Sequence, residues 1–195
     1  MTPLERYQYI TTVGGHSGGP WEHPQTLIPK IVLKEVLFPA NILDVGGGEG
    51  LVGYGVWPLH IPVCTLDIFE PATVPAGFTL GNALDAVTIY GAKSFDVVIC
   101  CEMIEHLPKE DGPKLMEVLE TVARKIVLFT TPWGFLLQDP RKESQEPWAN
   151  NPHQEHLCWY EPEDFIEKGY RVHFNGGGPG SNLVAWKCIT ECSPL

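Results

Sequence analysis

A continuous apolar run, FDVVICC at Phe95–Cys101, limits the folds that are open to this chain of 195 residues. Apart from Asp96 near its start the run is apolar, and such a strand must be covered on both faces, which is typical of a central strand in a parallel sheet. Strand-like segments also occur at 41–45, 61–67, 78–80 and 125–130, with turns or helical patterns between them. Strands that alternate with helices form βαβ units, so the sequence predicts an α/β fold.

Three helical segments and a hairpin complete the expected element order. Segments 25–37 and 115–122 place apolar residues at helical spacing, and PEDFIEKG, beginning at Pro162, forms a third helix. Segments 170–174 and 182–189 read as strands joined by the turn-rich NGGGPGS, so they must pair antiparallel. We therefore expect a Rossmann-like, seven-stranded, mostly parallel sheet with a C-terminal antiparallel hairpin and helices on both faces.

Two segments depart from this regular pattern. Residues 1–25 contain a glycine-rich stretch and predict an N-terminal lid or tail. Residues 132–160 form a long insertion with Trp and Pro residues, and connections of that length are usually functional or disordered. We assign this insertion to the substrate side and place both segments in a single domain over residues 1–195.

The formal net charge of −11 bears on the partners of this chain. Affinity for nucleic acid depends largely on Lys and Arg that neutralise phosphates, and the 13 basic residues form no dense cluster. A nucleic-acid partner is therefore disfavoured, a small-molecule acceptor is favoured, and a protein acceptor stays open. No apolar run approaches the roughly 20 residues of a membrane span. The N-terminus also lacks a secretory pattern, so we expect a cytoplasmic protein without a membrane partner.

The motif DVGGGEG at Asp44–Gly50 directly follows the first predicted strand. Glycines let the backbone turn sharply and approach a ligand with no Cβ in the way, and the amides of a following helix would face that ligand. The acid at Asp44 would repel a phosphate but attract the ammonium group of a methionine-type ligand. Asp67 ends the next strand, where a carboxylate can accept hydrogen bonds from both hydroxyls of a ribose.

Three further residues fit an adenosyl group. Ile68 can pack on an adenine face, while Asn82 and Ala83, at the tip of the third strand, offer a side-chain amide and a backbone N–H to the adenine edge. The segment GEGLVG at 48–53 also fits the G-x-G-x-x-G pattern, so an NAD-dependent oxidoreductase is a rival interpretation. The acid at Asp44 and the terminal hairpin favour the methionine-derived cofactor.

Five segments in order, ILDVGGGEG, TLDIFEP, GNALDA, FDVVICCEMIEHLP and IVLFTTPWG, resemble the motifs of class I S-adenosylmethionine-dependent methyltransferases, especially the methyltransferase-11-like group. The resemblance implies methyl transfer from S-adenosylmethionine to an acceptor that the sequence does not identify. The cofactor residues that it implies are Asp44, Gly46, Gly48 and Gly50 for the methionine part, Asp67 for the ribose, Asn82 and Ala83 near the adenine, and Cys101 near the methionine end. The usual Pro-Gly-Gly turn before the fifth strand is replaced by ARK, which predicts a tighter helix–strand connection.

Acidic and imidazole residues follow the central strand in EMIEH. If a helical turn begins there, Glu102, Glu105 and His106 share one face, and His156 from the insertion can join them. Two carboxylates and two imidazoles can bind a divalent metal. The set resembles two metal-assisted branches of the family, the small-RNA 2′-O-methyltransferases and the catechol-type O-methyltransferases of ubiquinone biosynthesis. There a metal would lower the pKa of the acceptor hydroxyl.

Other interpretations of these residues stay open. Without a metal, His106 or His156 can act as a general base, because the unperturbed pKa of histidine lies near neutrality. The Glu-His pair can also be structural. Finally, the chain can be a cofactor-binding protein that keeps the fold without turnover, since fold does not imply function.

Overall fold

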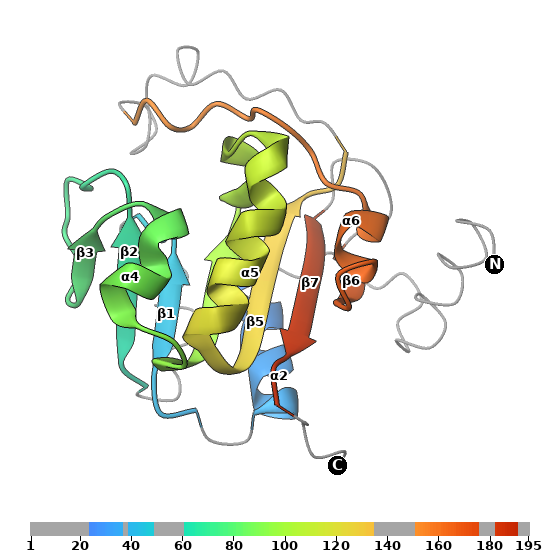
Figure 1. The fold of residues 1–195 in the computed structure, drawn as a ribbon, viewed down its shortest axis with the longest axis horizontal. Coiled ribbons are helices and arrows are strands. Elements are labelled where there is room, and N and C mark those ends of the chain that lie inside the picture. Colours follow the sequence, from blue (N-terminus) through green and yellow to red (C-terminus); the bar gives the residue numbers. More distant parts are fainter. Residues whose placement is uncertain (1–23, 37–38, 49–60, 135–150, 176–181, 191–195) are drawn as a thin grey trace.

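The computed structural model describes residues 24–36, 39–48, 61–134, 151–175 and 182–190. Within these residues, one seven-stranded sheet has the order β3-β2-β1-β4-β5-β7-β6 (Figure 1). The strands are β1 Ile42–Val45, β2 Val63–Asp67, β3 Phe78–Leu80, β4 Phe95–Cys101, β5 Ala123–Pro132, β6 Arg171–Asn175 and β7 Asn182–Cys188. Here β7 runs antiparallel to both of its neighbours and the other six strands are mutually parallel, which confirms the predicted fold class.

Helices cover both faces of the sheet. Helix α2 lies behind the sheet and helices α4 and α5 lie in front of it in Figure 1. The helices are α2 Pro24–Glu35, α4 Ala86–Tyr90, α5 Gly112–Val122 and α6 Pro162–Ile166, and the 3-10 turns are η2 Ala83–Asp85, η3 Ile104–His106 and η4 Lys109–Asp111. Among the described residues, no helix has the length and apolar character that crossing a membrane requires.

The strand β4 divides the core into two layers. All seven of its residues are buried. Val98 and Cys100 belong to the layer that contains Leu115 of α5, whereas Val97 and Ile99 belong to the layer beneath α2. Because successive side chains of a strand point to opposite faces, an uninterrupted apolar run supplies both layers, as the sequence predicted.

The connection between α5 and β5 is as short as the sequence predicted. The helix ends at Val122 and the strand begins at Ala123, with no residue between them. Three apolar residues of α5, Leu115, Leu119 and Val122, are buried at helical spacing and hold the helix on the sheet.

The carboxyl ends of the parallel strands form one edge of the sheet, and residues 151–160 pass over this edge toward α6 (Figure 1). Most of the predicted N-terminal lid, residues 1–23, and the central part of the insertion, residues 135–150, lie outside the described residues. Residues 151–160 are therefore the part of the insertion whose contacts with the candidate functional site can be described.

Candidate functional site

The glycine turn after β1 combines tight packing with open space. Asp44 is buried at the end of the strand, and the backbone N–H of Gly46 donates to the Leu66 carbonyl at 2.7 Å. Gly46 and Gly48 have φ values of 72° and 51°, in the left-handed region that favours glycine. A Cβ on Gly46 would collide with the Met103 side chain, but a Cβ on Gly48 would meet no atom of the described residues within 4 Å. Among these residues, the turn leaves room for a ligand beside Gly48.

Asp67 ties the end of β2 to this turn. Its Oδ2 accepts a hydrogen bond from the Gly48 N–H and its Oδ1 accepts one from the Phe69 N–H, both at 2.9 Å. The neighbouring Ile68 is 48% exposed and so presents an apolar surface beside the end of β2. A fixed carboxylate and an exposed apolar surface next to an open glycine fit the ribose and adenine of an adenosyl group.

Asn82 and Ala83 occupy the tip of β3, where η2 begins. The Asn82 Oδ1 accepts a hydrogen bond from the Leu84 N–H at 2.9 Å and so caps this turn, while the residue itself is exposed. Its amide nitrogen therefore keeps its donors for a ligand. Ala83 is buried beside it.

Cys101 ends β4 on the layer beneath α2. Burial, and then the negative charge of Asp44, raise the pKa of its thiol well above the ordinary value. The thiol therefore stays neutral and acts by packing or weak hydrogen bonding rather than as a nucleophile. The described members of the predicted cofactor set thus end four neighbouring strands, β3, β2, β1 and β4, while Gly50 lies outside the described residues.

The helical face predicted for Glu102, Glu105 and His106 does not form. The 3-10 turn begins at Ile104, and Glu102 has a φ of 47°, which directs the chain sharply away from β4. This left-handed conformation costs a non-glycine residue about 1 kcal/mol. The Glu102 side chain reaches toward Thr130, whereas Glu105 and His106 turn toward the end of the insertion.

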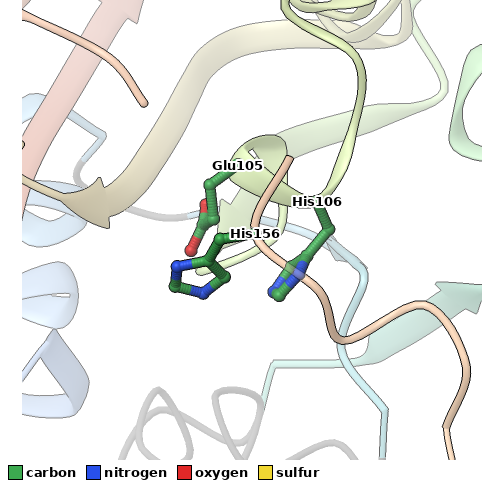
Figure 2. A group of neighbouring side chains, drawn as sticks. All are labelled: Glu105, His106 and His156. Atoms are coloured by element: carbon green, nitrogen blue, oxygen red, sulfur yellow. The ribbon is translucent and has the colours of Figure 1, made fainter. Parts of the chain in front are cut away.

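Glu105, His106 and His156 come together at the carboxyl edge of the sheet and form the three-residue cluster (Figure 2). One possible ligand atom from each residue lies within 4.8 Å of the others. The two imidazole ring centroids are 4.8 Å apart, and the Glu105 carboxyl points toward the His156 ring in Figure 2. The sequence separates His156 from the other two by about fifty residues, yet the fold brings it to them, as predicted.

Glu105 is the most unusual member of the cluster because it is 1% exposed and neither of its carboxyl oxygens has a hydrogen-bond partner. Burial, and then the nearby charge of Glu102, raise the pKa of its carboxyl well above the ordinary value. The buried Thr131 hydroxyl lies close enough to this carboxyl to oppose the rise in its pKa, but it makes no well-formed hydrogen bond to it. A buried carboxylate without a partner costs several kcal/mol, so this arrangement calls for a proton or a cation.

His106 is held in the form that binds metals. Its Nδ1 lies 3.0 Å from the Glu155 carbonyl oxygen, so the Nδ1–H donates there and the Nε2 keeps its lone pair. Burial, with a smaller contribution from the charge of His156, lowers the pKa of His106 to about 4. The ring is therefore neutral at pH 7, and a base this weak is poorly suited to take a proton from an acceptor.

The end of the insertion is fixed to η3 through main-chain contacts. The Leu157 and Cys158 N–H groups both donate to the Glu105 carbonyl, at 2.9 and 3.2 Å. Lys109 donates to the Trp159 carbonyl at 2.7 Å and lies over the Tyr160 ring. These contacts carry His156 to Glu105, and nothing in the sequence indicates them because they connect backbone groups far apart in the chain.

The comparisons with known proteins identify the family. A family model described as a methyltransferase domain matches residues 21–168. The chain belongs to this family. It is an S-adenosylmethionine-dependent methyltransferase, as the sequence motifs implied, and the NAD-dependent interpretation finds no support. No protein of curated function matches its sequence.

Solved structures with the same fold are distant in sequence. The 1,6-didemethyltoxoflavin-N1-methyltransferase of Burkholderia thailandensis, solved with S-adenosylhomocysteine, has 12% identity and a TM-score of 0.61 over 98% of this chain and 92% of its own. The magnesium protoporphyrin IX methyltransferase of Synechocystis PCC 6803, solved with S-adenosylmethionine, has 14% identity and a TM-score of 0.56 over 97% and 92%. The small RNA methyltransferase HEN1 has 18% identity and a TM-score of 0.55 over 89% of this chain and 28% of its own.

Proposed function

We propose that this methyltransferase acts on a hydroxyl group of a small-molecule acceptor and uses a divalent metal ion held by the three-residue cluster. The observation that carries the proposal is the buried Glu105 carboxyl, whose oxygens have no hydrogen-bond partner. A cation would supply the missing partner. His106 supports the proposal because the Glu155 carbonyl leaves its Nε2 available as a ligand atom.

The donor set narrows the choice of metal. Imidazole nitrogens suit Zn²⁺ and Fe²⁺, carboxylate oxygens suit Mn²⁺ and Mg²⁺, and a mixed set favours a first-row transition ion over Mg²⁺ alone. When bound, such an ion would lower the pKa of the acceptor hydroxyl and orient it. Glu105, His106 and His156 would hold the ion, and Glu102 is proposed as a fourth ligand.

The cofactor assignment is part of the same proposal. Asp44, Gly46 and Gly48 would hold the methionine part of S-adenosylmethionine, and Asp67 the ribose. The open space beside Gly48 and the fixed carboxylate of Asp67 support this placement. The adenine would lie at Ile68, Asn82 and Ala83, with Cys101 near the methionine end. The sulfonium is a good leaving group, so alignment of the two substrates can supply much of the rate.

The proposed acceptor class rests on the net charge of the chain and on the substrates named for two proteins of similar fold. A net charge of −11 disfavours a polyanionic substrate. Two proteins of similar fold are named for small aromatic substrates, a toxoflavin precursor and a porphyrin. A small phenol or catechol is therefore the proposed acceptor, and the 2′-hydroxyl of an RNA is the alternative that the experiment must include.

Radiolabelled methyl transfer tests the proposal. Metal-free protein is incubated with labelled S-adenosylmethionine and either a panel of catechols and phenols or a short RNA, with EDTA or with added Mn²⁺. We expect labelling of a small hydroxyl compound that needs Mn²⁺ and is lost in His156→Ala. The matched control is His153→Ala, because His153 is exposed on the same segment and lies outside the cluster.

Two results would overturn parts of the proposal separately. Equal labelling of an acceptor in EDTA and in Mn²⁺ would remove the metal from the reaction. Metal-dependent labelling of the RNA alone would keep the metal and replace the acceptor class.

A further inference from the structure

The side chains at the end of the insertion alternate between the inside and the outside of the molecule. His156, Cys158 and Tyr160 are buried, whereas Leu157 and Trp159 are 52% and 48% exposed. In an extended segment, residues separated by an even number of positions point to the same side. A shift of this segment by one residue would therefore turn His156 away from the other two members of the three-residue cluster.

Tyr160 packs against the start of α5 at very close range. The residue is 1% exposed, and a Cβ on Gly112, the first residue of α5, would collide with the Tyr160 hydroxyl oxygen and come within 2.9 Å of its Cζ. Gly112 has φ and ψ values of −57° and −50°, which are helical angles that other residues adopt without strain. Space for the Tyr160 ring, rather than the conformation of the backbone, is therefore what requires a glycine here.

Lys109 in η4 holds the same ring and the neighbouring main chain. Its Nζ lies 3.9 Å from the centroid of the Tyr160 ring, donates to the Trp159 carbonyl at 2.7 Å and pairs with the Asp164 Oδ2 at 2.6 Å. The same Asp164 oxygen accepts a hydrogen bond from the Glu161 N–H at 2.8 Å. A partly exposed ion pair contributes little by itself, but this ammonium group joins the ring, the main chain and the start of α6.

We propose that Lys109 and Gly112 are positioning residues, which hold Tyr160 at the start of α5 and so set the register that places His156 in the three-residue cluster. This inference rests on the proposed function, because it concerns the placement of a proposed metal ligand. Tyr160 and His156 are four residues apart, so both side chains point inward. The backbone hydrogen bonds from residues 157–158 to η3 lie between them and depend on the same register.

Gly112→Ala separates this role from a contribution to helix stability. Alanine favours a helix over glycine, so α5 alone would gain stability from the change. The added methyl group would instead displace the Tyr160 ring, and the segment that carries His156 would move with it. Tyr160→Phe in the same chain removes the oxygen that the methyl group meets first, so the double variant should recover part of the lost metal affinity.

Lys109→Met tests the second contact because it removes the ammonium group and keeps an unbranched side chain. The matched control is Lys114→Met. Lys114 is 67% exposed and its ion pair is with Asp111, in the same stretch of chain as Lys109. We expect this control to bind Mn²⁺ as the parent protein does.

The experiment measures the dissociation constant of Mn²⁺ by calorimetry, the Tm, and the amide hydrogen exchange of residues 157–158 for the full chain and these variants. We expect about tenfold weaker Mn²⁺ binding in Lys109→Met and Gly112→Ala, which is typical of residues that orient a metal ligand. Exchange at residues 157–158 should be faster in both, because their hydrogen bonds to η3 open more often.

The outcomes distinguish this inference from the proposed function. If the parent protein binds Mn²⁺, unchanged affinity in both Lys109→Met and Gly112→Ala would overturn this inference alone, even with a lower Tm. A parent protein that binds no Mn²⁺ would overturn the proposed metal site. In that case, unchanged exchange at residues 157–158 in both variants would overturn this inference as well, and faster exchange would support it.

Discussion

At the scale of single residues, Gly46 and Gly48 in the turn after β1 have different surroundings. Both Gly46 and Gly48 have positive φ values, so alanine at either position pays the cost of a left-handed conformation. A Cβ on Gly46 would also collide with Met103, whereas one on Gly48 would meet no atom of the described residues within 4 Å. Gly46 is therefore needed for packing, and Gly48 is the glycine that we propose for the cofactor.

A comparison of Gly46→Ala with Gly48→Ala tests this division. We expect Gly46→Ala to lower the free energy of unfolding by about 3 kcal/mol, because overpacking adds to the backbone cost. Gly48→Ala should lose about 1 kcal/mol of stability and at least about tenfold in affinity for S-adenosylhomocysteine. Urea unfolding and calorimetry supply the two readouts. Equal affinity losses in both variants would count against an open cofactor cradle at Gly48.

The sequence motifs predicted the positions of residues that lie within a motif. They did not predict the positions of residues that are held by contacts between distant segments. Asp44, Asp67 and Asn82 could be placed because each ends a strand, and parallel strands end at one edge. The hydrogen bond from Asn182 to Glu102 could not be predicted, because it depends on the direction and register of β7. The orientation of Glu102 was wrong for a related reason, since its positive φ breaks the helical spacing that the sequence suggested.

At the scale of elements, Asp96 joins the start of β4 to its surroundings. Its Oδ2 accepts from the Ala40 N–H at 2.8 Å and contacts Lys125 at 2.9 Å, while its Oδ1 accepts from Arg124 at 2.7 Å. Burial opposes ionisation, but these contacts prevail and hold the pKa of Asp96 at about 2. Both basic residues come from the ARK segment that replaces the usual turn before β5.

The pKa of Asp96 predicts a pH-dependent contribution to stability. Because the folded pKa lies below the unfolded one, the contribution is present above roughly pH 4 and is lost as the pH falls through about 2. Asp96→Asn should therefore cost about 2 kcal/mol at pH 7 and progressively less below pH 4. Urea unfolding of both proteins between pH 2.5 and 7 measures the difference. A cost that does not change with pH would show that the ion pairs contribute nothing.

Elements of regular periodicity were predicted more accurately than the turns between them. The buried residues of α5 recur at helical spacing, and the seven-residue run of β4 has the length of a buried strand rather than of a helix. The 3-10 turn at η3 has no such signature. Two of its residues, Glu105 and His106, are held by contacts with Glu155, Leu157 and Cys158, which arise only once the insertion has folded back.

At the scale of the whole molecule, the order of the strands brings the predicted site residues to one edge of the sheet. The residues proposed for the cofactor lie at the ends of β1, β2, β3 and β4, while the three-residue cluster lies after β4 beneath the end of the insertion. The sequence predicted this arrangement as a fold class, since alternating strands and helices followed by a hairpin leave few topologies. Glu105, His106 and His156 come together because residues 151–160 pass over the carboxyl edge of the sheet. No local sequence pattern predicts this passage.

The central claim is that the buried Glu105 carboxyl exists to bind a metal ion. Its pKa is raised in the folded state, so the metal-free protein loses stability as the pH rises above the unfolded value of roughly 4.3. Glu105→Gln removes that charge and keeps the shape. The variant should therefore unfold at a higher temperature than the metal-free parent protein at pH 7.5, by about 3 °C or more.

Thermal unfolding of the parent protein and of Glu105→Gln at pH 7.5, with EDTA or with Mn²⁺, is the most direct test. A ligand that binds the native state alone raises the Tm. We predict that Mn²⁺ raises the Tm of the parent protein and leaves that of Glu105→Gln unchanged, while the variant is the more stable of the two in EDTA. A variant that is less stable in EDTA and still gains stability from Mn²⁺ would contradict the account, because Glu105 would then be a structural residue and the metal would bind elsewhere.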